Sequence, residues 1–390
     1  MAAPVSPNSL IGFGLGSKTG VSHMDKRARK RAIRIAQIVF SVVLVVGIFA
    51  FAIPKIANYG DVWRAVNAMT WLEITSLVAV SAINILTYWP LMVASMPGLT
   101  LGQAAVNNQS STSIANTLPG GGFIATGVSY SMYRSWGFTN AEIGLTTIIT
   151  GVWNTFIKLG MPIIALAALA ITGRTNAALV VPTVIGILVL LVAIGLFAGM
   201  LWKKSMARAI GGGLGKAASF LRKWFHKPEV HWGDAAARFR KQTIGLISKR
   251  WPALTVSALV SHFALYLVLL LALRHVGISE REINWAQVLG VFAFVRLISA
   301  FPITPGGIGL VELGYIGGLY VAGRSHADVP LDAFKAQVAA SVLVFRTLTF
   351  LFQIPLGALT YVIWQRKKSW RKPVPHEAAE PAVAGAPSPG

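Results

Sequence analysis

The sequence predicts an all-α, polytopic membrane protein with two re-entrant, broken-helix regions. Of its 390 residues, 54% are hydrophobic and only 12% are charged, the balance of a chain that crosses a bilayer several times. Several apolar stretches reach about 20 residues, the length that spans a bilayer as a helix. Two Pro-Gly-Gly sequences, at 119–121 and 305–307, interrupt apolar regions where a helix would otherwise continue.

Six apolar segments are long enough to span the membrane. The first, 35–53, is too long for the core of a signal peptide, so we expect it to be retained. The other expected spans are 71–96, 142–171, 177–201, 252–273 and 334–364. The last is longer than one straight crossing requires, so we expect it to be tilted or broken at Pro355.

Three basic segments set the predicted orientation. The N-terminal tail, the linker 202–250 and the stretch after Trp364 hold most of the 35 lysine and arginine residues. Because positive residues gather on the cytoplasmic side of membrane spans, we expect the linker and both termini to be cytoplasmic. Membrane orientation thus accounts for the net charge of +22, and we expect no nucleic-acid partner.

This orientation places the two interrupted regions on opposite sides. Region 97–140 begins and ends inside, whereas region 284–323 begins and ends outside. A broken helix is tolerated in hydrocarbon only where it is buried in protein or lines a wet cavity. The paired breaks therefore predict an inverted repeat with a midplane site. The alternative is that two loops rich in Gly and Pro, common in membrane proteins, match by coincidence.

The chain divides into five expected parts. These are a disordered basic tail at 1–32, a first membrane half at 33–201, a basic amphipathic linker at 202–251, a second membrane half at 252–365, and a basic and then disordered tail at 366–390. In the linker, Leu214, Leu221 and Trp224 recur at helical spacing among basic residues. This pattern predicts a helix on the membrane surface, with a solvated loop as the alternative.

Ionisable residues inside a bilayer are costly and are candidates for function. Arg346 lies deep in the last span, so we expect it to face the interior, near Glu312 or the Gly306–Gly307 break. An arginine fork fits phosphate oxygens, and Arg296 lies nearby in sequence. The arginines and the glutamate form either an anion site or a neutralising structural cluster. We interpret His262 as a neutral core residue.

The candidate substrate-binding residues follow from the breaks and the intramembrane charges. They are Gly120, Gly121, Lys158, Arg296, Gly306, Gly307, Glu312 and Arg346. The sequence has no cysteine, no histidine pair at metal spacing, no Walker motif and no nucleophile elbow. We therefore expect no enzymatic activity, no metal and no cofactor.

The segment Pro302-Ile303-Thr304-Pro305-Gly306-Gly307-Ile308-Gly309-Leu310-Val311-Glu312, followed by Arg346 and Pro355, resembles the lysylphosphatidylglycerol synthase transmembrane-region family, also called the flippase-like domain family. Leu118-Pro119-Gly120-Gly121 is similar to its earlier, weaker motif, with Thr126 at the repeat position of Glu312. The resemblance implies a bacterial or archaeal cell-membrane protein. In relatives, this region translocates lipid and a fused aminoacyltransferase makes it. Because no such domain follows the last span here, we expect no lipid aminoacylation.

The resemblance and the residues together predict a lipid flippase-like transporter. Its substrate would be an anionic lipid, either a phospholipid or a polyprenyl-phosphate-linked sugar. The lipid would enter laterally and place its phosphate at Arg296, Arg346 and the Gly306–Gly307 backbone. The alternative is an accessory membrane subunit or scaffold that works with a separate glycosyltransferase or lipid synthase.

Overall fold

The computed structural model describes residues 59–118, 121–173, 177–202, 205–206, 209, 233–299 and 305–373. Within these ranges the chain is helical and has no strand. Four helical stretches are long and apolar enough to cross a membrane: Trp71–Ser95, Asn140–Ile171, Thr243–His275 and Leu331–Arg366. The predicted all-α, polytopic membrane fold is therefore confirmed. The expected span 35–53, the tip of the first break at Pro119 and Gly120, the linker helix and both expected disordered tails lie outside the described residues.

The first half contains seven helices among the described residues. They are α2 (Tyr59–Asn67), α3 (Trp71–Thr87), α4 (Trp89–Ser95), α5 (Leu101–Thr117), α6 (Gly121–Ser135), α7 (Asn140–Ile171) and α8 (Ala177–Trp202). Capping boxes begin α3, α5 and α7, where Thr70, Thr100 and Thr139 each exchange hydrogen bonds with the third helical residue. The expected span 71–96 is divided at Tyr88, because the ring of Pro90 is incompatible with an unbroken helix there.

The second half contains five α-helices and two short turns among the described residues. It comprises α10 (Gly233–His275), α11 (Trp285–Ile298), a 3₁₀ turn (Pro305–Gly307), α12 (Leu310–Gly323), α13 (Leu331–Arg346), a π-helical turn (Thr347–Leu351) and α14 (Gln353–Arg366). The described helix α10 begins well before the expected span start at Pro252. Leu246 and Leu254, on either side of this proline, are buried in one cluster with α4 and α7, and this packing keeps the helix continuous.

The last span is broken one turn earlier than Pro355. Proline has no N–H, so the carbonyl of Leu351 lacks its usual helical donor. The chain accommodates this with a π-helical turn, in which Phe352 N–H donates to the Thr347 carbonyl at 2.9 Å. The widened turn therefore begins directly after Arg346.

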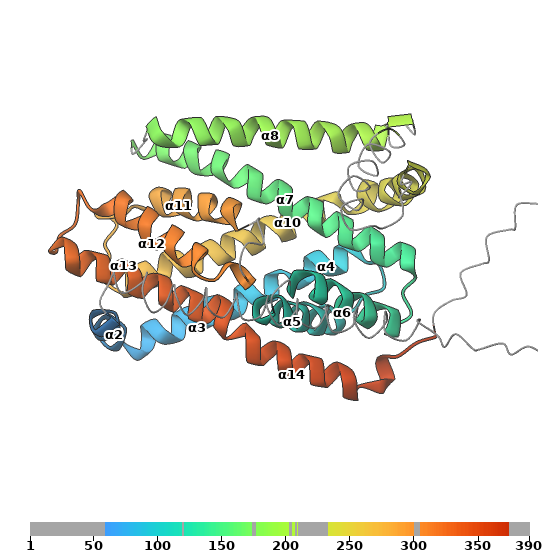
Figure 1. Ribbon diagram of the computed structural model, residues 1–390, viewed down its shortest axis with the longest axis horizontal. Coiled ribbons are helices and arrows are strands. Elements are labelled where there is room, and N and C mark those ends of the chain that lie inside the picture. Colours follow the sequence, from blue (N-terminus) through green and yellow to red (C-terminus); the bar gives the residue numbers. More distant parts are fainter. Residues whose placement is uncertain are drawn as a thin grey trace, which may run out of the picture.

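The long helices lie side by side along the long axis of the molecule (Figure 1). In this view α5 and α6 occupy the right-hand half, and α11 and α12 occupy the left-hand half. Each half packs one helix against the other half, because α5 packs along α14 and α11 packs along α7. An inverted repeat would produce this reciprocal packing, although the repeat itself stays a prediction.

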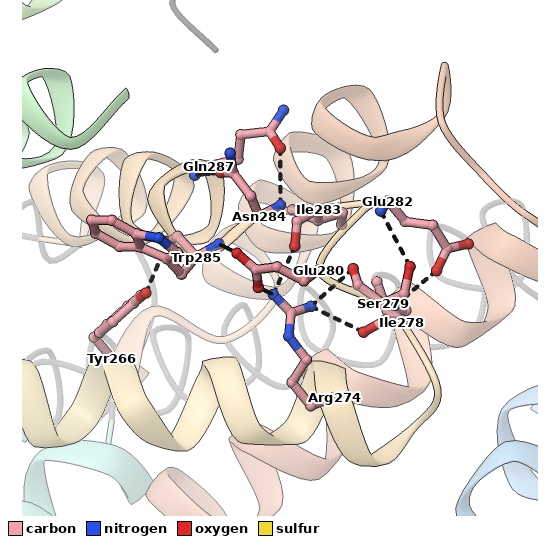
Figure 2. A network of polar contacts seen from close by, with 10 residues as sticks. All are labelled: Tyr266, Arg274, Ile278, Ser279, Glu280, Glu282, Ile283, Asn284, Trp285 and Gln287. Atoms are coloured by element: carbon pink, nitrogen blue, oxygen red, sulfur yellow. Dashed lines mark hydrogen bonds and ion pairs between the residues drawn. The ribbon is translucent and has the colours of Figure 1, made fainter. Parts of the chain in front are cut away.

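A polar network holds the turn between α10 and α11 (Figure 2). The Arg274 guanidinium donates to the carbonyls of Ile278, Ser279 and Ile283 at 2.9, 3.2 and 2.8 Å, and it forms an ion pair with Glu280. Glu280 in turn accepts the backbone N–H of Trp285 at 2.8 Å. The guanidinium thus joins the end of α10 to the first residue of α11.

Glu282 extends this network to the next loop. It accepts the backbone N–H of Ser279 at 2.8 Å, and its other oxygen accepts the N–H of Asp328 at 2.9 Å. Gln287 then exchanges hydrogen bonds with Asn284, the N-cap of α11. The start of α11 is therefore fixed at this end of the molecule, which also fixes the direction of a helix whose last turn carries Arg296.

The α5–α14 contact depends on Gly357. A Cβ at this position would collide with the Gln109 carbonyl oxygen and the Ser113 side chain. We predict that Gly357→Ala lowers the free energy of unfolding by about 1–3 kcal/mol through overpacking. The matched control is Gly317→Ala on α12, where nothing lies within 4 Å. Thermal unfolding in detergent checks both variants, and equal melting temperatures would contradict the packing argument.

Orientation can be tested with two serines on opposite sides of the last span. Ser325, between α12 and α13, and Ser369, after α14, are both exposed. On this cysteine-free chain we expect an impermeant maleimide to label Ser325→Cys in intact cells and Ser369→Cys only after permeabilisation. Labelling of Ser369→Cys in intact cells would show that the predicted orientation is inverted.

Candidate functional site: a polar cavity between the two halves

A cavity of about 530 Å³ is lined by helices from both halves. The first half contributes residues of α3 to α7, and the second contributes residues of α10 to α14 and the turn at Gly306. Most of the lining side chains carry amides or hydroxyls. Among the described residues, its charged lining consists of Arg296 and Arg346.

Arg346 is bound to the second helix break. Its Nε donates to Glu312 Oε1 at 2.6 Å, and its Nη2 donates to the Gly306 carbonyl at 3.2 Å. The other carboxylate oxygen of Glu312 accepts the Gly309 N–H at 2.6 Å and so caps α12. The side chains of Arg346 and Glu312 are only 14% and 3% exposed. The pair therefore satisfies backbone groups on both sides of the break.

The break requires glycine at particular positions. Gly306, Gly307 and Gly309 have φ values of 57°, 72° and 84°, in the left-handed region that favours glycine. A Cβ at Gly306 would collide with the ring of Phe350, over which the Arg346 guanidinium lies at 4.3 Å from the centroid. The same Cβ would lie 3.1 Å from Asn116 Oδ1, near the end of α5. The chain entering the first break thus contacts the second break.

Arg296 differs from Arg346 in having no carboxylate partner among the described residues. It lies in the last turn of α11 and lines the cavity, and its Nε is buried without a hydrogen-bond partner in the part of the chain that the structure describes. The cationic group available to a ligand is therefore Arg296, with Arg346 beside the cavity but already bonded.

The family profile of the lysylphosphatidylglycerol synthase TM region matches residues 36–357. The chain belongs to this family. The match includes both helix breaks and nearly all of the described membrane helices. No curated protein matches the chain. Family membership indicates a lipid-related, flippase-like function in the membrane.

The structure brings part of the predicted site together. Arg296, Gly306 and Arg346 line the cavity, whereas Gly121, Gly307 and Glu312 do not, and Gly120 lies outside the described residues. Lys158 on α7 is half-buried and close enough to Arg296 for charge repulsion, but it does not line the cavity.

Two backbone groups of the second break already have partners. The Gly309 N–H is bonded to Glu312, and the Gly306 carbonyl accepts from Arg346. A carboxylate at the N-terminus of α12 occupies the position that an anionic ligand would need. Binding of phosphate by the Gly306–Gly307 backbone stays a prediction, and of the two arginines Arg346 is already bonded to Glu312.

The amide side chains of the cavity were missed by the sequence reasoning. They are Asn84, Asn107, Asn108, Gln109, Asn154 and Gln353. Gln109 is 2% exposed, and neither atom of its amide has a hydrogen-bond partner among the described residues. The available signal was the run of amides and hydroxyls from 107 to 113 within an otherwise apolar region.

The cavity lining also includes His262 and exposed residues of α6 and α7. His262, interpreted as a neutral core residue, is 3% exposed and lines the cavity. Its Nδ1 lies 2.9 Å from the Ala258 carbonyl, and Nε2 has no partner within the described ranges. Gly122 and Thr126 on α6 and Thr147 on α7 are lining residues that remain exposed. Together with the few contacts between α6 and α7, these exposed lining residues indicate an opening of the cavity between the two helices; Phe123 on α6 is 84% exposed.

The Arg346–Glu312 pair leads to a stability prediction. Removing one partner of a buried ion pair leaves the other charge unpaired, at a cost of about 3–5 kcal/mol. We expect Glu312→Gln to lower the free energy of unfolding by most of this amount. The substitution leaves Arg346 without its counter-charge, and the neutral amide also caps α12 less strongly. The control is Arg281→Ala, which breaks the exposed Arg281–Asp328 pair and should cost about 0–1 kcal/mol. Thermal unfolding in detergent measures both, and equal losses would contradict a structural role for Glu312.

Proposed function

We propose that this protein is a lipid flippase-like transporter that moves an anionic lipid between the two leaflets, without catalysing a reaction. The observation that carries the proposal is the Nε of Arg296, which is buried beside the polar cavity and has no hydrogen-bond partner among the residues that the structure describes. An uncompensated cation in a membrane domain is costly and marks a binding site for a charged group. The lipid-related function of the family supports the same conclusion.

A lipid headgroup would enter between α6 and α7. Its phosphate would bind Arg296, because charge-assisted hydrogen bonds from a guanidinium fit phosphate oxygens. Arg346 would add positive charge but little hydrogen bonding, since its Nε and Nη2 are committed to Glu312 and Gly306. A cavity of about 530 Å³ suits a headgroup, while the acyl chains stay in the bilayer.

Alternating access would follow from the inverted repeat. The reciprocal packing of α5 on α14 and of α11 on α7 supports two halves of equivalent construction. At present α6 contacts α7 at few points, whereas α12 packs along α13. We propose that the opposite state closes the α6–α7 side and opens the α12–α13 side, with the glycine breaks absorbing the change.

The proposed setting is a bacterial or archaeal cell membrane with both termini in the cytoplasm. Arg366 ends the last span, Lys367, Lys368 and Lys372 follow it, and Lys372 N–H donates to the Ser135 carbonyl at the end of α6. This basic end contrasts with the other end of the molecule, where Arg274 and Arg281 are paired with acidic residues. The asymmetry is that of the positive-inside rule.

A second candidate function is a scaffold or accessory subunit for a lipid-modifying enzyme. The observation that favours it is the Arg346–Glu312 pair, whose charges are satisfied internally and need no ligand. That pair alone would be consistent with a closed structural core. The cavity, and an Arg296 Nε without a partner in the described part of the chain, have no role in such a core, so they favour transport.

Substituting Arg296 tests the proposal directly. A hydrogen bond to a charged group is worth about 1.5–3 kcal/mol, so Arg296→Ala should slow translocation by about 10- to 100-fold. Arg296→Lys keeps the charge without the planar fork and should give an intermediate rate. Arg281→Ala removes an exposed arginine far from the cavity and should translocate normally. The measurement is the rate of fluorescent phosphatidylglycerol translocation in proteoliposomes, per folded molecule. Normal transport by folded Arg296→Ala would refute the headgroup role.

A further inference from the structure

The residues that line the cavity indicate which chemical groups the lipid headgroup carries. This inference rests on the proposed function. We propose that the headgroup is a phosphate bearing a neutral group with several hydroxyls, such as glycerol, inositol or a sugar, and not an amine. Three features of the cavity support this headgroup: the charges of its lining, the unpaired polar atoms among its described residues, and the placement of arginines and amides in different halves.

The charges disfavour an ammonium group. Arg296 and Arg346 line the cavity, and among its described lining residues there is no aspartate or glutamate. The nearest carboxylate in the site, Glu312, does not line the cavity, and both its oxygens are bonded, to Gly309 N–H and Arg346 Nε. An ammonium headgroup would therefore meet the positive charge of Arg296 with no carboxylate in the described lining to compensate it, which is unfavourable.

The unpaired polar atoms favour hydroxyls. Gln109 lacks partners for both atoms of its amide, and His262 lacks one for Nε2, in the described part of the chain. Buried polar groups normally have hydrogen-bond partners, so each of these atoms indicates a missing one. An amide offers both donors and an acceptor, and a hydroxyl can satisfy either. A headgroup with several hydroxyls would supply partners for both residues together.

The arginines and most of the amides that line the cavity come from different halves of the molecule. The arginines belong to α11 and α13, in the second half. Five of the six lining amides belong to α3, α5 and α7, in the first half, and the sixth belongs to α14. One headgroup can thus place its phosphate against the arginines and its hydroxyls against α5. A soluble phosphorylated polyol has the same chemistry. The opening between α6 and α7, beside the exposed Phe123, favours a lipid as its source.

The experiment compares headgroups on the full chain, with two separate readouts. Purified protein is reconstituted into vesicles, and translocation of fluorescent phosphatidylglycerol and phosphatidylinositol is compared with that of phosphatidylethanolamine and lysylphosphatidylglycerol. We expect the hydroxyl-bearing lipids to move about tenfold faster, because the amine lipids meet like charge. Binding of the same lipids to protein in detergent is measured by thermal shift, with glycerol 3-phosphate as the soluble probe.

The two readouts distinguish failure of this inference from failure of the proposed function. Equal translocation and binding of the amine lipids would overturn the inference and leave transport standing. Selective binding of the hydroxyl-bearing lipids without translocation would support the inference and refute transport. Stabilisation by glycerol 3-phosphate but by no lipid would overturn the lipid source.

Two variants test the lining itself. Asn108→Asp places a carboxylate on a half-buried lining residue and should raise translocation of the amine lipids relative to phosphatidylinositol. Gln365→Glu adds the same charge on the exposed surface of α14 and should leave the preference unchanged. Gln109→Leu should slow phosphatidylinositol but not phosphatidic acid, which has a phosphate and no further hydroxyl group. An unchanged preference in folded Asn108→Asp and Gln109→Leu would overturn the assignment of the amides to the headgroup.

Discussion

The structure depends on satisfying backbone groups where a helix is broken inside the membrane. With no water in the hydrocarbon, each unpaired N–H or carbonyl costs several kcal/mol. At the second break, Glu312 accepts the Gly309 N–H and Arg346 donates to the Gly306 carbonyl. The two side chains also neutralise each other through the 2.6 Å bond between them. One ion pair thereby stabilises the left-handed glycines of the break, beside which the ring of Phe350 and Asn116 near the end of α5 lie.

The Glu312 ion pair determines how much positive charge each arginine presents to the cavity. Because Glu312 neutralises Arg346, the unbalanced positive charge of the cavity resides mainly on Arg296. An arginine in the middle of a membrane costs about 2.5–3.5 kcal/mol on insertion scales. The network around Arg274 and Glu282 fixes the start of α11. A rotation of α11 that carried Arg296 toward the membrane interface would break these hydrogen bonds. A rigid helix thus holds an uncompensated cation beside a polar cavity, which is an arrangement suited to binding an anion.

The sequence was sufficient to predict features that depend on length, local chemistry or a strong penalty. The span that became α7, the interruption at Gly306–Gly307 and the proximity of Arg346 to Glu312 all follow from such rules. Features set by tertiary packing were not predicted. Pro252 does not end a helix because Leu246 and Leu254 are packed on both sides of it. The amides of α5 became recognisable as a cavity wall only once α5 was seen to pack between α6 and α14.

The two halves of the predicted repeat differ in chemistry. At the position predicted to correspond to Glu312, the first half has Thr126, which donates to the Gly122 carbonyl at 2.8 Å and carries no charge. The first half instead uses hydroxyls, as in the 2.9 Å bond from Ser113 Oγ to the Ile354 carbonyl. A carrier must bind its cargo strongly enough to admit it and weakly enough to release it on the other side. Two opposed arginine clusters would retain a phosphate, whereas one available arginine facing neutral amides permits both entry and release. The unequal chemistry of the halves is therefore consistent with movement of an anion through the site.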